Sequence, residues 1–82
     1  MVEQNAMIYK QTTQERVCQF VADFVKQYEM PPSVRMISDG MALAPTTIHF
    51  HLTNGVESGR LRKVGKDRHV AYLPANVRIV VE

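Results

Sequence analysis

Residues 31–74 read PPSVRMISDGMALAPTTIHFHLTNGVESGRLRKVGKDRHVAYLP and contain the most informative pattern of the chain. It predicts two short helices joined by a tight turn, then a strand, a basic hairpin tip and a second strand. That order is typical of a winged helix-turn-helix, an α+β scaffold that places one helix in the DNA major groove and a β-hairpin, the wing, against the backbone. We therefore expect double-stranded DNA to be the partner of this chain.

A longer helix is predicted before this stretch, from Thr12 to about residue 28. Thr12 and Glu15 have the spacing of a capping box, in which each side chain accepts a hydrogen bond from the backbone N–H of the other residue. Pro31 and Pro32 end the helix, because proline has no N–H to donate. A stripe at three- and four-residue spacing is expected to form the largest part of the core: Val17, Phe20, Val21, Phe24, Val25 and Tyr28.

The two short helices are predicted at residues 34–40 and 45–58. Ser33 offers an N-cap hydroxyl to the first, and Pro45 suits the first position of the second. In the second helix Ile48, Leu52 and Gly55 lie on one side and are expected to face the core. The opposite side carries Thr46, His49, Phe50 and Thr53, with no acidic residue among them.

These outward side chains suit a helix that reads bases. Threonine can bond to base edges, histidine can bond to a purine N7 or a phosphate, and phenylalanine can pack on a thymine methyl group. Two alternatives stay open. Thr46 and Thr47 would instead cap the helix or contact phosphates, and the Phe50 ring would instead fold onto the hairpin or be buried in a homodimer.

The hairpin is predicted as antiparallel strands at residues 61–64 and 69–73 around a tip at residues 65–68. Half of the 10 Lys and Arg residues of the chain lie here: Arg60, Arg62, Lys63, Lys66 and Arg68. Positive charges on a wing can neutralise DNA phosphates, which adds affinity that falls as salt rises. The alternative is a set of solvated charges that protects a sheet edge from aggregation.

The chain is expected to divide into an amino-terminal arm at residues 1–11, a winged helix-turn-helix domain at 12–74 and a tail at 75–82. The tail alternates Val77, Ile79 and Val81 with more polar neighbours, so it is strand-like. No partner for such an extra terminal strand is evident within the hairpin. An unpaired apolar strand is a template for another strand, and we expect these three residues to pair two copies in a homodimer.

Several classes of protein are disfavoured. The length of 82 residues allows one small domain, and the net charge of +2 is too small to indicate a nucleic-acid partner by itself. The sequence shows no nucleophile–base pair, carboxylate pair or phosphate loop, so neither an enzyme nor a cofactor is expected. His49 and His51 point roughly 200° apart on a helix and cannot share a zinc ion. Cys18 is a lone, half-buried side chain. No apolar run has bilayer length and no signal peptide is present, so no membrane association is expected and the location is cytoplasmic.

Three motifs, in order, resemble the amino-terminal DNA-binding domain of LexA-type repressors: PPSVRMIS, LAPTTIHFHL and ESGRLRKVG. The resemblance covers residues 12–73 and implies a sequence-specific transcriptional regulator, a repressor, from a prokaryotic, phage or plasmid context. It implies that recognition-helix positions facing bases are Thr46, Thr47, His49 and Phe50, and that Ser33, Arg35 and the wing residues lie close to phosphates.

The sequence departs from the family's pattern in three places. Met36 stands where a helix-capping glutamate is usual, Ala42 where a turn glycine is usual, and the connector before Pro45 is one residue shorter. The self-cleaving domain of LexA repressors does not fit in this length, so we expect either a stand-alone small regulator or an excised domain. A second hypothesis is a winged-helix module that binds protein through Phe50 and the apolar tail. Salt-dependent binding to random duplex DNA would distinguish the two.

Overall fold

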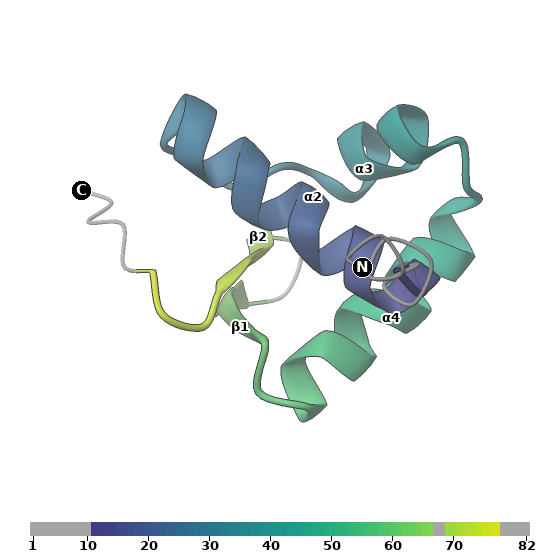
Figure 1. Cartoon of the computed structure of the whole chain (residues 1–82). Helices are drawn as coiled ribbons and strands as arrows, with labels where there is room; N and C mark the ends of the chain where they lie inside the picture. The colour runs from purple at the N-terminus through teal and green to yellow at the C-terminus, as the bar shows by residue number, and fades with distance from the viewer. Residues whose placement is uncertain (1–10, 67–68, 78–82) are drawn as a thin grey trace, which may run out of the picture.

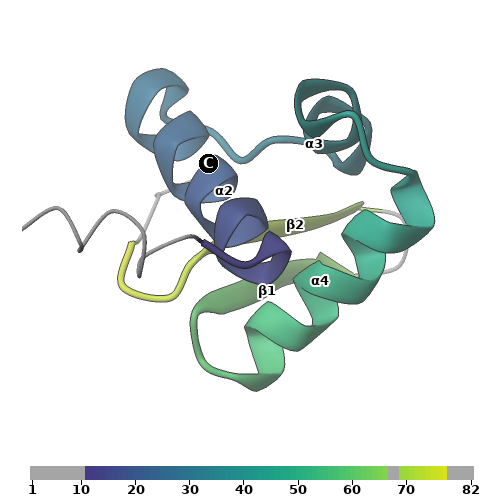
Figure 2. The same cartoon turned by 45° about the vertical axis from the view of Figure 1, so that its right-hand side comes forward.

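The structure, a computed structural model, describes residues 11–66 and 69–77. Three helices, α2 (Thr13–Tyr28), α3 (Val34–Met41) and α4 (Pro45–Glu57), precede two strands, β1 (Leu61–Lys66) and β2 (His69–Pro74) (Figure 1 and, turned by 45°, Figure 2). The strands pair antiparallel. The prediction of a winged helix-turn-helix is therefore confirmed, and each predicted helix boundary lies within one residue of the observed one.

The start of α2 is fixed by the predicted capping box. Thr12 Oγ1 accepts from the backbone N–H of Glu15 at 3.1 Å, and Glu15 Oε1 accepts from the N–H of Thr12 at 3.0 Å. The helix ends at Glu29, which is left-handed with φ 58° and donates its N–H to the Val25 carbonyl. A local sequence signal thus determines the start of this helix, and a left-handed residue closes its end.

The turn between α3 and α4 is stabilised by Ser38. The carbonyl of Ser38 accepts from the N–H groups of Ala42 and Leu43, and its hydroxyl donates to the Leu43 carbonyl. Ala42 ends α3 in the left-handed region with φ 58°. The position of the usual turn glycine therefore keeps a conformation that favours glycine, although alanine occupies it.

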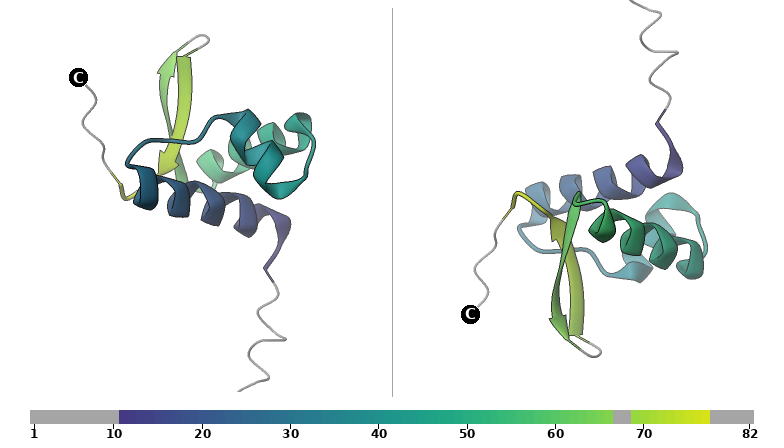
Figure 3. Two further views of the ribbon diagram at one scale, coloured as in Figure 1. Left: turned by 90° about the horizontal axis from the view of Figure 1, so that it is seen from above. Right: turned by 90° about the horizontal axis from the view of Figure 1, so that it is seen from below.

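The hairpin projects away from the helices (Figure 3). Its register runs from Leu61 opposite Pro74 to Lys66 opposite His69, so the strands are longer than predicted. Gly65 and Lys66, expected in the tip, belong to β1. Gly65 has φ 91°, and a Cβ there would collide with the His69 carbonyl oxygen. The remaining tip, residues 67–68, lies outside the described residues.

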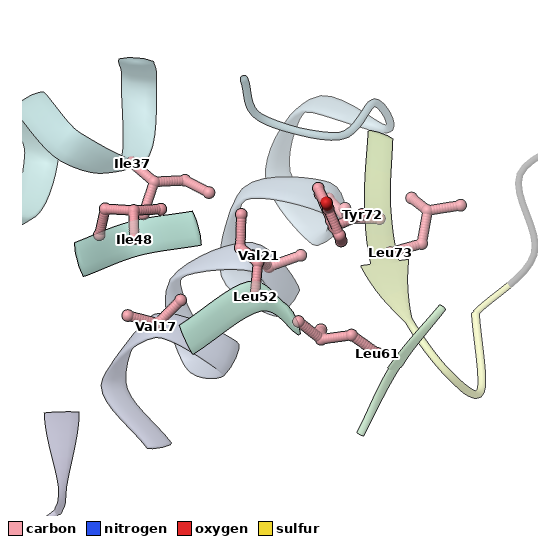
Figure 4. Packing of buried hydrophobic residues seen from close by; sticks show 9 residues of the cluster. Val17, Val21, Ile37, Ile48, Leu52, Leu61, Tyr72 and Leu73 are labelled. Carbon is pink, nitrogen blue, oxygen red and sulfur yellow. The ribbon is translucent and has the colours of Figure 1, made fainter. Parts of the chain in front are cut away.

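The core joins all five elements (Figure 4). Its buried side chains are Val17, Val21 and Val25 from α2, Ile37 from α3, Ile48 and Leu52 from α4, and Leu61, Tyr72 and Leu73 from the hairpin. A Cβ on Gly55 would come 2.7 Å from Leu61 Cδ1, so glycine lets α4 and β1 approach closely. This packing fixes the hairpin relative to α4.

The aromatic residues of the α2 stripe, Phe20, Phe24 and Tyr28, are less buried than we expected. Phe20 and Phe24 are half-buried, and Tyr28 is 54% exposed. Their rings form a ladder at the rim of the core, with centroids 6.3 Å apart for Phe20 and Phe24 and 4.5 Å apart for Phe24 and Tyr28. The buried valines recur every four residues, and the aromatic residues stand one position earlier, about 100° around the helix.

After β2 the chain turns back. Residues 75 and 76 form a turn, and the N–H of Val77 donates to the Pro74 carbonyl at 3.0 Å. Residues 75–77 therefore form no strand, in contrast to the strand-like tail that we expected, and Val77 is half-buried against the core. Ile79 and Val81, like the arm at residues 1–10, lie outside the described residues. Within the described part of the chain, no helix combines the length and apolar character needed to cross a membrane.

Candidate nucleic-acid interface

One face of α4 is buried and the opposite face is open. Ile48 and Leu52 are fully buried, whereas four of the predicted base-reading residues are exposed: Thr46, His49, Phe50 and Thr53. Phe50 is 61% exposed, which is unusual for a phenylalanine. Thr47 is half-buried at the edge of this face. The structure thus gathers the five predicted base-reading residues on one helix and leaves four of them open to a partner.

The amino terminus of α4 has no side-chain cap. Ala44 occupies the N-cap position and makes no side-chain hydrogen bond, and Pro45 has no N–H. The first intrahelical donor to the N-cap carbonyl is the Ile48 N–H, at 3.0 Å from the Ala44 oxygen. The backbone N–H groups of Thr46 and Thr47 are therefore left for an outside acceptor, and an uncapped helix start attracts anions such as phosphate.

The amino terminus of α3 provides two further polar groups. The Ser33 hydroxyl accepts from the Met36 N–H at 3.0 Å, which leaves the hydroxyl hydrogen free to donate. Arg35 is exposed in the first turn of α3. Since α3 packs directly against α4, both groups are carried on the helix-turn-helix itself.

The hairpin exposes Lys63 and Lys66. Arg68, also expected to contact phosphates, lies outside the described residues. Arg60 is exposed before β1, and its Nη2 atom lies 3.9 Å from the Glu15 carboxylate. An exposed pair at this distance contributes little stability, so Arg60 can exchange Glu15 for another anion.

Arg62 differs from the expectation. It is half-buried, and its Nη2 donates to the Val77 carbonyl oxygen at 2.8 Å. Its Nε is buried without a hydrogen-bond partner in the part of the chain that the structure describes. The guanidinium group is thus engaged inside the domain, where it holds the residues after β2 against β1.

A contact between α2 and α4 beside the open face is not apparent from the sequence. Gln14 Nε2 donates to the His51 carbonyl oxygen at 2.8 Å, and Gln14 Oε1 lies 2.8 Å from His51 Nδ1. The His51 ring meets the Phe50 ring edge-on, with centroids 5.3 Å apart and an interplanar angle of 73°. From the sequence, the only role suggested for His51 is a metal site shared with His49, which helix geometry excludes. No group of three side chains that could hold a metal ion occurs among the described residues.

Comparison with known families agrees with this geometry. The family model for the LexA DNA binding domain matches residues 11–67, which is more than half of the chain. The match includes α2, α3, α4 and β1, and therefore all five predicted base-reading residues. Domains of this family bind DNA and are not enzymes. No curated protein and no solved structure matched the chain.

Proposed function

The chain belongs to the LexA DNA-binding domain family, and on this basis we propose that it is a sequence-specific transcriptional repressor. In this proposal α4 enters the major groove of double-stranded DNA and presents Thr46, Thr47, His49, Phe50 and Thr53 to base edges. The phosphate contacts come from Ser33, Arg35, Lys63, Lys66 and Arg68. Arg62 is left out because its guanidinium group already binds the Val77 carbonyl.

The observation that carries the proposal is the composition of the open face of α4. Hydroxyl, imidazole and aromatic side chains project from it, and the sole acidic residue of the helix, Glu57, is its last residue. A helix face that only meets water is usually rich in charged residues. The uncapped start of α4 and the exposed lysines of the hairpin add positive potential, which a DNA backbone would neutralise.

Affinity and specificity then come from different residues. Phosphate contacts position the protein and bind any sequence, whereas contacts to base edges distinguish sequences. A protein bound at a site excludes other proteins from that site, which supports repression. The family further supports a cytoplasmic, DNA-associated role in a prokaryote or in its phages or plasmids.

We further propose that the repressor binds as a homodimer, because a single small domain provides limited discrimination against the competing sites of a genome. A two-fold dimer would bind inverted half-sites separated by about 10 base pairs or a multiple of it. Val77 is already packed in its own domain, so the pairing would rest on Ile79 and Val81.

Selection of bound sites from a random duplex pool tests the proposal. The expected result is one enriched motif, with inverted symmetry if a dimer binds. The logarithm of the binding constant should fall linearly with the logarithm of salt concentration. A pool without enrichment, together with binding that ignores salt, would overturn the proposal in favour of a protein-binding module that uses Phe50 and the tail.

A further inference from the structure

Gln14 of α2 holds residue 51 of α4 at two points, although the residues are 37 positions apart. The backbone carbonyl of His51 can only accept, so the atom of Gln14 that contacts it at 2.8 Å is the amide nitrogen. The amide oxygen therefore faces His51 Nδ1 at 2.8 Å. Because an amide oxygen can only accept, Nδ1 carries the hydrogen, and the tautomer and orientation of the imidazole ring are both fixed.

The fixed imidazole ring lies against Phe50. Its edge-on contact, with centroids 5.3 Å apart at 73°, is a favourable geometry for two aromatic rings. Phe50 is 61% exposed, so the core does not determine where its ring points. Among the described residues, His51 is the one aromatic partner of the Phe50 ring. The direction of the most exposed apolar side chain on α4 thus depends on a ring that Gln14 holds.

From this arrangement we propose that Gln14 is a positioning residue for DNA recognition, acting through His51 to preset the Phe50 ring. The inference rests on the proposed function, because it deepens the account of how α4 reads DNA. A ring that is held in place before binding loses less rotamer freedom when it docks against a base. The gain applies only to the base pair that Phe50 contacts, so Gln14 contributes to specificity without touching DNA.

The test uses the full chain and two probes, a duplex recovered by selection and a random-sequence duplex. The measured quantity is the ratio of the two affinities. Gln14→Met keeps the length of the side chain and removes both hydrogen bonds, and it should lower the ratio by about three- to tenfold, a modest coupling for contacting residues. Gln14→Glu still accepts from Nδ1 but places a carboxylate oxygen, which cannot donate, against the His51 carbonyl, so its ratio should lie between those of the wild type and Gln14→Met.

Gln19 provides a matched control. It is exposed on α2, and its amide nitrogen bonds to the Asp23 carboxylate at 2.8 Å rather than to α4. Gln19→Met therefore makes the same chemical change on the same helix and should leave the ratio unchanged. Imidazole nitrogen NMR of the free protein at alkaline pH gives a second readout. In Gln14→Met the His51 ring should shift from the Nδ1–H tautomer toward the Nε2–H tautomer.

The Phe50→Ala background separates positioning from simple stabilisation. If Gln14 acts through Phe50, adding Gln14→Met to Phe50→Ala should leave the ratio where Phe50→Ala put it. An equal fall of the ratio in both backgrounds, or an equal loss of affinity for both duplexes, would show a structural role alone and overturn the inference. A wild-type chain that binds both duplexes equally would instead overturn the proposed function itself.

Discussion

Arg62 in β1 donates a hydrogen bond from Nη2 to the carbonyl oxygen of Val77 at 2.8 Å, across 15 residues of sequence. An arginine of the basic hairpin thus links β1 to the residues that follow β2. The neighbouring lysines, Lys63 and Lys66, are exposed. The basic cluster therefore contains two kinds of residue, one that holds the fold and others that are free to meet an anion.

This division predicts that substitution of Arg62 affects stability, whereas substitution of the lysines affects DNA binding. Arg62→Ala should lower the free energy of unfolding by about 1–3 kcal/mol, because the half-buried Val77 carbonyl loses its charged donor. Lys63→Ala combined with Lys66→Ala should leave stability nearly unchanged and reduce the salt slope of DNA binding by about two. Urea denaturation and binding titrations over a range of salt measure the two effects. Lys26→Ala, on α2, serves as the control for a basic residue elsewhere. An unchanged slope in the double variant would remove the hairpin from the DNA contact.

The open face of α4 is predicted to determine sequence preference. Thr47→Ala or His49→Ala should cost roughly 1–3 kcal/mol on the selected site and much less on random DNA, since base contacts alone depend on sequence. Ile48→Ala on the buried face should instead lower stability by about 2–5 kcal/mol through lost packing. Equal losses on both duplexes would reassign Thr47 and His49 to the backbone.

Ala42→Gly is expected to stabilise the protein. Ala42 has φ 58°, a region that glycine occupies without steric cost. Relief of that strain, less the greater freedom of glycine in the unfolded chain, should raise the free energy of unfolding by about 0.5–1 kcal/mol. Ala75→Gly is the matched control, because Ala75 lies in a turn and does not have a positive φ. This substitution should be neutral or slightly destabilising. Thermal unfolding of the two variants side by side decides the matter, and a lower melting temperature for Ala42→Gly would contradict it.

Ala44→Asp is expected to separate stability from binding. A carboxylate at the N-cap would accept from the first-turn N–H groups of α4 and add about 1 kcal/mol of stability. The same change occupies donors that we assign to a phosphate and brings a negative charge beside it, so affinity for every duplex should fall. Ala44→Ser caps without charge and should lower affinity less. Unchanged DNA affinity at low salt in Ala44→Asp would place the start of α4 away from the backbone.

A chain that ends at Arg78, one residue later so that the Val77 carbonyl stays an amide, tests the homodimer. This truncation keeps the Arg62 bond and the packing of Val77 while removing Ile79 and Val81. The full chain should sediment as a dimer and gain affinity from a second half-site, and the shortened chain should be monomeric with the same thermal stability. Monomers in both cases, with no gain from the second half-site, would contradict pairing through the tail.

Much of the fold follows from local signals in the sequence. Thr12, Ser33 and Pro45 each mark a helix start, and the structure places the helices where these residues predict. Gly59, with φ 85°, adopts after α4 a left-handed conformation that glycine favours. These signals act within one turn of helix, which is why a single sequence is enough to reveal them.

The features that sequence reasoning missed depend on contacts between distant residues. Nothing in the sequence pairs Gln14 with His51 or Arg62 with Val77, because a long polar side chain finds its partner only after the elements pack. The aromatic ladder was misassigned for a related reason: Phe20, Phe24 and Tyr28 share the spacing of the buried valines, and the position of the hairpin and α3 decides which row is covered. Gly65 was predicted in the tip because glycine permits a turn. In the structure it has φ 91° and still pairs with Val70 as part of β1.

The contact between α2 and β2 has a consequence for how the domain is made in the cell. The first of the described helices packs against α3 and α4 and also against the last strand, so during synthesis the part of its apolar face that meets β2 stays uncovered until β2 has emerged. Helices can form early from local signals, but Tyr72 and Leu73 arrive last and complete the shared core. The family match ends at residue 67, before these two residues. A nascent chain stalled at that point would hold a complete α4 on an unfinished core, exposed to chaperones and proteases.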